Sequence, residues 1–330
     1  MRRSRLVASL LVLALAITGA AANAQRVISM ATLAPAGSTW MRVLEASSRE
    51  LRRRTNGALN IRWYAGGVQG DDAEVIRKIR SGRLDGAAVT GAGLSQIHRP
   101  TLAFELPAIF ESPEQFARAR DALRPTLEAA FDQAGFVLLG FDGAGRTRMF
   151  STAPIRTPAE MRRMHPWLWP DNALMPLIYQ EVGVQGVPLQ LPEVLSGLQT
   201  HRIDVVYGSP LVAIALQWAS HVTTMTAEGA SAMTGGLVIS RAQFNTLPAD
   251  QQQIVREVVN QYHVLLARNR VRDEQTAEAT LIARGTQVVN LTPAERQQWL
   301  TVFQGVRNRA AGVIADPAWI ARVQAAGRGS

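Results

Sequence analysis

A helix, a tight turn and a strand occur twice in this chain with similar residues at equivalent positions. The segment EVIRKIRSGRLDGAAVT, residues 74–90, aligns without a gap with EVLSGLQTHRIDVVYGS, residues 193–209. Glu, Val, Arg and Asp recur, and the apolar positions of the helix recur with them. Two copies of such a unit predict two similar α/β lobes. Because the match is short, a chance likeness between two amphipathic helix-turn-strand units remains the alternative.

Each copy ends its strand in a small hydroxyl residue, Thr90 in the first and Ser209 in the second. Ligands of open α/β sheets bind beyond the carboxyl ends of the strands. If the two lobes face each other, Thr90 and Ser209 are expected on opposite walls of one cleft. The alternative is that both are ordinary residues at the start of a loop.

The N-terminal part of the chain follows a β, α, β order. A β-rich run at 26–31 precedes a helix that is predicted to start at Ser38 or Thr39 and to end before Asn56-Gly57. Residues 59–64 then alternate like a strand. This order favours a mostly parallel sheet covered by helices.

Helical spacing then continues without a break from Thr246 to Gly285, with Pro248 in the first turn. A helix of this length exceeds what one small lobe can cover. It is therefore expected to run across both lobes, along the hinge.

The N-terminus carries arginines, then an apolar run from Leu6 to about Ile17, then Ala22-Asn23-Ala24. This is the pattern of a secretory signal peptide, residues 1–24, with cleavage expected after about Ala24. The protein is therefore expected to be exported. It contains no cysteine, which excludes a disulfide framework, a thiolate metal site and a cysteine nucleophile.

Charge and motifs argue against nucleic-acid binding and catalysis. The formal net charge is +9, but the arginines scatter through every segment and Lys78 is the only lysine. The five histidines are dispersed, and the chain contains no G-x-S-x-G, P-loop or G-x-G-x-x-G pattern. Asp71-Asp72 is better explained as a helix N-cap than as part of a calcium loop. The motif search therefore supports no metal site, no cofactor site and no enzyme, and an enzyme is not the predicted class.

Several segments together resemble one family, the substrate-binding subunits of tripartite ATP-independent periplasmic (TRAP) transporters, of the dicarboxylate-binding or DctP type. In the family's order they are MATLAPAGSTWMRVLEASSREL, LNIRWYAGGVQGDDAEVIRKIRSGRLDGAAVT, LPAIFESPEQ, PIRTPAEMRRM, GVPLQLPEVLSGLQTHRIDVVYGSP and ISRAQFNTLPADQQQIV. They cover most of the chain after the signal peptide.

The resemblance implies a two-lobed periplasmic-binding-protein fold of the α/β class, with mostly parallel sheets, crossing hinge strands and a long helix shared by both lobes. Lobe 1 is expected to comprise residues 25–147 and about 233–270, and lobe 2 residues 148–232 and about 271–330. The resemblance also implies a periplasmic location and a small organic ligand held between the lobes. Its partners would be the small and large integral membrane subunits of the transporter, which an ion gradient drives.

The family holds a ligand carboxylate with an arginine in the strand after the TPAEM-like helix. Here that position falls on Trp167, within RRMHPWLWPDN, residues 162–172. An indole offers area and one N–H but no charge, so it cannot replace a guanidinium fork. With period two, Trp167 and Trp169 share one face and are expected to form an apolar wall of the cleft. The alternative is that both indoles fill the core of lobe 2.

The leading prediction is therefore a solute receptor for a relatively apolar organic ligand. Its predicted ligand-binding residues are Leu33, Ala34, Trp40, Gln69, Thr90, Gly91, Arg146, Arg148, Trp167, Trp169, Tyr207, Ser209 and Met233. One alternative is an organic-acid receptor in which Arg146 or Arg148, at the crossover into lobe 2, meets the carboxylate. Another is a ligand sensor or delivery protein with a tetratricopeptide partner, as the resemblance implies for some variants that lack the arginine.

Overall fold

The computed structural model describes residues 25–329, apart from the side chains at positions 263, 267 and 270. The predicted signal peptide, residues 1–24, lies outside the described residues. The strands are β1 Arg26–Thr32, β2 Leu59–Tyr64, β3 Gly86–Thr90, β4 Phe136–Ser151, β5 Trp167–Leu168, β6 Val187–Pro188, β7 Val205–Gly208, β8 Thr224–Thr226, β9 Ser231–Ser240 and β10 Gln287–Val289.

The helices, with short 3-10 turns labelled η, are α2 Thr39–Arg54, α3 Asp72–Arg80, α4 Gly91–Ile97, η1 Arg99–Glu105, α5 Pro113–Gln133, α6 Pro158–Met161, α7 Met175–Val182, η2 Leu191–Glu193, α8 Val194–Gln199, α9 Pro210–Ala215, η3 Trp218–Ser220, α10 Arg241–Phe244, α11 Ala249–Ala283, α12 Pro293–Ala310 and α13 Pro317–Arg328. None of the helices in residues 25–329 combines the length and hydropathy needed to cross a bilayer.

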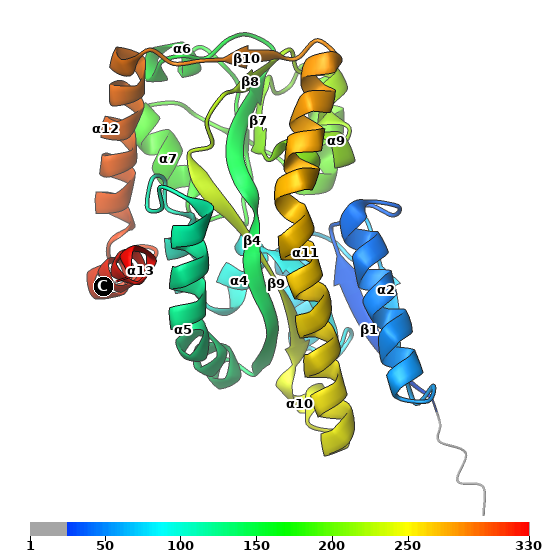
Figure 1. Ribbon diagram of the computed structural model, residues 1–330. Helices are drawn as coiled ribbons and strands as arrows, with labels where there is room; N and C mark the ends of the chain where they lie inside the picture. The colour runs from blue at the N-terminus through cyan, green and yellow to red at the C-terminus, as the bar shows by residue number, and fades with distance from the viewer. Residues whose placement is uncertain (1–24, 330) are drawn as a thin grey trace, which may run out of the picture.

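Two long strands, β4 and β9, cross the centre of the molecule and join two groups of shorter strands (Figure 1). On one side β9 pairs with β3, which continues through β1 to β2. On the other side β4 pairs with β7 and β8, and β8 pairs with β10. The pairs β1–β2, β1–β3 and β8–β10 are parallel, as predicted, whereas every pair in this sheet that includes β4 or β9 is antiparallel. The crossing strands therefore supply the antiparallel pairs of this sheet.

Strand β4 changes partners part-way along its length. Its paired residues from Phe136 to Thr147 lie against β9, whereas residues 148–151 pair with β7. The last two of these also pair with β8. The change between Thr147 and Arg148 coincides with the boundary expected between the lobes.

Local capping signals set the starts of several helices. Ser38 caps α2 by accepting a hydrogen bond from the amide of Met41 at 3.2 Å. Thr292 and Glu295 form a complete capping box at the start of α12. Each cap satisfies amides that the first helical turn leaves without partners, so these boundaries follow from a few neighbouring residues.

The predicted long helix is α11, which is 35 residues long and is preceded by Pro248 as its N-cap. It packs against β4, against α2 beside β1, and against α9 beyond β7 (Figure 1). Because its contacts reach both groups of strands, α11 spans the molecule as expected.

The repeated segments form the same local structure twice. Helix α3 leads into β3, and helix α8 leads into β7. Thr90 then caps α4 by accepting from the amide of Ala92, and Ser209 caps α9 by accepting from the amide of Val212. The helix-turn-strand prediction is confirmed for both copies, and each strand ends in a helix cap.

The two C-terminal helices pack against different parts of the molecule. Helix α12 packs against α7, but α13 packs against α5 and η1. The indole of Trp319 donates to the carbonyl of Pro100 at 3.0 Å, and Arg118 donates to the carbonyl of Gly327 at 3.0 Å. The last helix, assigned to lobe 2 on the sequence, thus lies on elements assigned to lobe 1.

Candidate ligand-binding cavity

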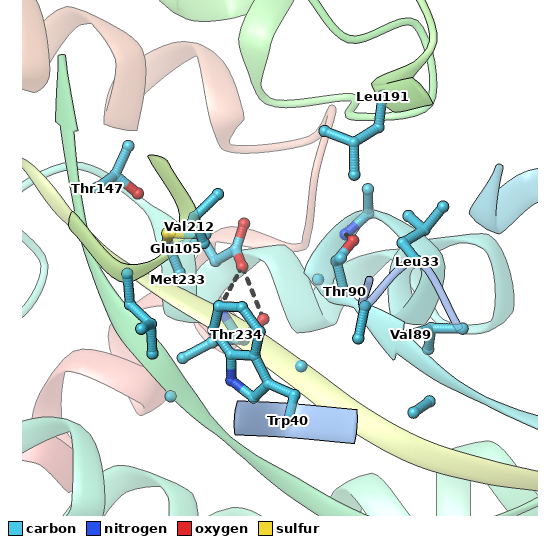
Figure 2. Close-up of a pocket in the computed structure, with 18 of the residues that line it drawn as sticks. Leu33, Trp40, Val89, Thr90, Glu105, Thr147, Leu191, Val212, Met233 and Thr234 are labelled. Atoms are coloured by element: carbon cyan, nitrogen blue, oxygen red, sulfur yellow. Dashed lines mark hydrogen bonds between the residues drawn. The ribbon is translucent and has the colours of Figure 1, made fainter. Parts of the chain in front are cut away.

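A cavity of about 330 Å³ lies between the two groups of strands, beside the ends of β3 and β7. Its wall combines residues of α2, β3, β4, β9 and α11 with residues around β5, β7 and α9 (Figure 2). A crevice beyond the strand ends is where α/β proteins bind ligands, and this volume suits a small organic molecule. Large apolar side chains of the wall include Leu33, Trp40, Leu44, Val89, Trp167, Trp169, Leu191, Val212 and Met233.

Trp167, at the position of the family's arginine, and nearby Trp169 belong both to this wall and to the hydrophobic core. Trp167 is 1% exposed and Trp169 is 7% exposed. Their rings stack with centroids 5.6 Å apart, and Tyr207 stacks on Trp167 at 4.7 Å. Trp218 meets Trp167 edge-on, and the Trp167 indole donates to the carbonyl of Leu189 at 2.8 Å. The two sequence alternatives for these residues are therefore not exclusive.

Tyr207 brings a hydroxyl group to the same wall. This buried hydroxyl makes no hydrogen bond of ordinary geometry within the described residues, although the backbone of Trp169 lies close to it. Burial raises the pKa of Tyr207 well above its ordinary value, and the Glu105 carboxylate adds to the shift. The hydroxyl is therefore neutral at physiological pH and can act as a donor or an acceptor.

Glu105 is the last residue of η1 and places a carboxyl group in the cavity wall. The residue is nevertheless largely buried, with 9% of its surface exposed. Its Oε1 accepts hydrogen bonds from the amide and the hydroxyl of Thr234, at 2.6 Å and 2.7 Å. Figure 2 shows the other oxygen pointing away from Thr234. Among the described residues no basic side chain pairs with Glu105, and burial raises its pKa to about 7.

Sequence reasoning missed Glu105. The available signal was a lone acidic residue in the apolar run LAFELPAIF, residues 102–110. A carboxyl within such a run is either buried with partners or placed at a functional surface.

Three further acidic side chains line the cavity, namely Asp142, Asp273 and Glu274. Asp142 pairs with Arg120 at 2.6 Å, and Glu274 accepts a hydrogen bond from Ser209 at 2.6 Å. Within the described part of the chain no group of three or more such residues could hold a metal ion. The lining residues whose side chains are described include no arginine, lysine or histidine.

Most of the predicted ligand-binding residues do line this cavity. They are Leu33, Ala34, Trp40, Thr90, Gly91, Trp167, Trp169, Tyr207 and Met233. Their role in ligand binding stays a prediction, because position alone does not identify a contact.

The two predicted arginines are not among the described lining residues. Arg148 forms a two-pronged ion pair with Glu278 of α11, with N–O distances of 2.7 Å and 2.9 Å. Arg146 donates two hydrogen bonds to the carbonyl of Gly229, and burial lowers its pKa. Both guanidinium groups thus hold crossing strand β4 to neighbouring segments.

Gln69 and Ser209 also lie outside the described lining. The side-chain oxygen of Gln69 accepts from Lys78 at 3.1 Å. Ser209 is fully buried and donates to Glu274, so it supports an acidic residue of the wall. Thr90 and Ser209 therefore do not face each other across the cavity as expected, since only Thr90 reaches it.

The start of α4 is packed tightly against Glu105. A Cβ atom built on Gly91 would collide with the Glu105 carboxyl and would lie 2.5 Å from the Thr234 hydroxyl. Beside it, the hydroxyl and the amide of Thr90 both donate to Asp72, at 2.6 Å and 3.1 Å. Burial raises the pKa of Asp72 to about 7. Glycine at position 91 thus allows the carboxyl to reach the cavity wall.

A family model described as bacterial extracellular solute-binding protein, family 7 (DctP), matches residues 30–311 of the chain. The chain belongs to the DctP family. This membership confirms the resemblance drawn from the sequence segments.

Individual DctP relatives are distant in sequence. A solute-binding protein of Chromohalobacter salexigens is 27% identical over 165 residues, and this match spans about half the length of each chain, 49%. The C4-dicarboxylate-binding periplasmic protein DctP of Vibrio cholerae is 22% identical over 267 residues, 78% of each chain.

The fold is shared with solved structures of the same kind. A TRAP periplasmic solute-binding protein from Xanthobacter autotrophicus, with bound β-D-galacturonate, superposes with a TM-score of 0.84. The two chains are 18% identical, and the match covers 91% of this chain and 99% of that one. The present protein thus has the two-lobed α/β fold of TRAP binding proteins.

Proposed function

We propose that this protein is a periplasmic solute-binding subunit of a TRAP-type transporter that captures a relatively apolar organic ligand between its two lobes. The protein delivers this ligand to the small and large membrane subunits, and it performs no chemical reaction on it. Family membership and the named binding-protein relatives support this role. The names of these relatives give no support to a tetratricopeptide partner.

The observation that carries the ligand class is the wall of the cavity. Trp167 and Trp169 form an apolar surface, and the described lining contains no basic side chain. A carboxylate buried without a cation or several donors is costly, whereas an apolar body gains free energy by leaving water for this apolar lining. The lining therefore favours a ligand whose largest part is uncharged.

The proposal places the hinge where β4 exchanges β9 for β7, between Thr147 and Arg148. Residues 25–147 with about 233–270 move as one lobe, and residues 148–232 with about 271–310 move as the other. The contacts of α13 with α5 and η1 assign the C-terminal helix to the first lobe in this proposal.

An organic-acid receptor is the competing function, because the named relatives include a dicarboxylate-binding protein. In that case an arginine must meet the acid. Arg146 and Arg148 are engaged by Gly229 and Glu278. Arg270 is included in the same test. Position 270 lies about one helical turn along α11 from Leu266 and from Glu274, and both of these residues line the cavity.

Thermal unfolding with added ligands separates the two functions, since a ligand that binds only the folded state raises the melting temperature. Monocarboxylates, dicarboxylates, hydrophobic acids and uncharged aromatic compounds form the panel. The proposal predicts shifts with apolar compounds that Trp167→Ala removes and that Arg148→Ala and Arg270→Ala preserve. A dicarboxylate shift that only an arginine substitution removes would contradict it.

A further inference from the structure

We propose that Glu105 is the polar anchor of this cavity and that the ligand is an organic amine, a protonated ammonium group on an apolar body. This inference rests on the proposed function and names the ligand class of the same site. It concerns a residue to which the sequence motifs assign no role.

The geometry of Glu105 divides its two oxygens between the protein and the cavity. Oε1 is held by the amide and the hydroxyl of Thr234, which orients the carboxyl group. The other oxygen has no hydrogen-bond partner among the described residues and points away from Thr234 in Figure 2. The residue is only 9% exposed, so bulk water cannot solvate this oxygen freely. When Glu105 is ionised, this oxygen is an acceptor that a donor on the ligand can satisfy.

An ammonium group meets that requirement best. It supplies both N–H donors and a positive charge, and charge-assisted hydrogen bonds are about twice as strong as neutral ones. A ligand carboxylate at the same place would bring two negative groups together and raise the cost of ionising either one. An uncharged ligand would leave the Glu105 carboxylate without a counter-charge, since no basic side chain among the described residues pairs with it.

The rest of the wall suits the remainder of such a ligand. Trp167, Trp169 and Tyr207 form one stacked aromatic surface, and Trp40 contributes a further indole from α2. Aromatic faces attract cations and cover apolar groups. The hydroxyl of Tyr207 adds a second polar group, and it lies near enough to Glu105 for the carboxylate to raise its pKa. The Glu105 carboxyl and the Tyr207 hydroxyl, beside this aromatic surface, match one ammonium head on a ring-sized body.

The test uses matched sets of small molecules that differ only in their polar end. Tryptamine, tryptophol and indole-3-propionate carry an indole with an ammonium, a hydroxyl and a carboxylate group. Phenethylamine, 2-phenylethanol and 3-phenylpropionate form a second set, and cyclohexylethylamine with its alcohol and acid form a third. Binding to the full mature chain is measured by titration calorimetry and by thermal unfolding at pH 8.

Glu105→Gln removes the charge but keeps an oxygen that can accept from Thr234. Glu45→Gln makes the same change on the exposed face of α2 and serves as the matched control. Amines are expected to bind more tightly than the alcohols and acids of the same set. Glu105→Gln is expected to weaken amine binding about tenfold or more and alcohol binding far less, while Glu45→Gln alters neither.

The remaining outcomes overturn the inference in distinguishable ways. If alcohols bind as well as amines and Glu105→Gln affects neither, the apolar receptor stands and Glu105 has no ligand role. If carboxylates alone bind, the amine assignment fails and the organic-acid receptor is supported instead. If no amine of the three sets binds, the amine assignment fails. Because Glu105→Gln also changes a buried site, circular dichroism and a binding measurement with the alcohols show whether the variant is folded.

Discussion

The indole nitrogen of Trp169 donates a hydrogen bond to Oδ2 of Asp71 at 3.0 Å and so joins two segments 98 residues apart in the chain. The same carboxylate oxygen accepts from the amide of Leu191 at 2.9 Å, and Oδ1 caps α3 through the amide of Asp72 at 2.8 Å. One side chain from the first predicted lobe therefore holds two groups of the second. These donors converge on one buried acceptor, so Asp71 links the start of α3 to the segments around Trp169 and Leu191.

The Asp71–Trp169 bond is expected to contribute to closure of the lobes. Asp71→Ala removes the acceptor, and Trp169→Phe removes the donor but retains an aromatic ring. In a double-mutant cycle the two substitutions should show a coupling of about 1–2 kcal/mol in the free energy of unfolding, since they delete one buried hydrogen bond. Small-angle scattering should show a larger radius of gyration for Asp71→Ala. Additive effects and an unchanged radius would mean that the contact does not hold the lobes together.

Stability should depend on pH through Glu105. Its pKa is about 7 in the folded protein and 4.5 when unperturbed. Between these values the unfolded chain has lost the proton that the folded chain retains, so this group makes the protein less stable as pH rises from 4.5 to 7. Relative to the wild type, Glu105→Gln should therefore gain about 1–3 kcal/mol of unfolding free energy over that interval.

The comparison between wild type and Glu105→Gln is needed because other groups titrate in the same range. Asp72 adds a slope of the same sign, and half-buried His98, whose pKa is lowered by burial, adds one of opposite sign. Both are common to the two proteins and cancel in the difference. Urea unfolding at several pH values measures the difference in unfolding free energy between the wild type and Glu105→Gln. If that difference does not change between pH 4.5 and 7, the prediction is contradicted.

Gly91→Ala should displace the Glu105 carboxyl. The added methyl group collides with that carboxyl and with the Thr234 hydroxyl. Because the contact lies between a helix start and a buried side chain, the expected loss of stability is about 1–3 kcal/mol. Gly82→Ala is a contrasting change, because open space surrounds Gly82 and the added methyl group meets no neighbour. Any loss of stability there comes from the φ of +72°, which disfavours a side chain. If combining Gly91→Ala with Glu105→Ala restores no stability, the collision is not the cause.

Tyr207→Phe removes a buried hydroxyl that makes no hydrogen bond of ordinary geometry within the described residues. The unliganded protein should keep its stability or gain up to about 1 kcal/mol, because no protein hydrogen bond is lost. Tyr179→Phe is the matched control, since the Tyr179 hydroxyl donates to the carbonyl of Trp167 at 2.5 Å. That change should cost about 1 kcal/mol. Equal losses in the two variants, measured by urea unfolding, would show that Tyr207 has a partner after all.

Elements determined by neighbouring residues were predicted well from the sequence. The strand expected at 59–64 is β2, and the helix expected from Ser38 or Thr39 is α2 with Ser38 as its cap. Thr157 and Glu160 form a complete capping box at the start of α6. In each case a few adjacent side chains satisfy the backbone, so the pattern is readable without knowledge of the fold.

Long-range pairings were not predictable in the same way. Arg148 was expected near a ligand but pairs with Glu278, and Ser209 was expected in the cleft but donates to Glu274. Both partners come from α11, far along the chain. An arginine or a serine carries the same local signal whether its partner is a ligand or another side chain. Only the position of α11 against β4 and α9 decides between them.

The amino-acid sequence by itself determined the order of helices and strands, the long shared helix and the aromatic pair at the position of the family's arginine, because these depend on periodicity, capping and residue identity. The tertiary structure alone decided that Glu105 reaches the cavity while Arg146 and Arg148 do not. The physical reason is that a cavity is formed by segments distant in the chain, and the burial, solvation and partners of a polar side chain arise only when those segments pack together.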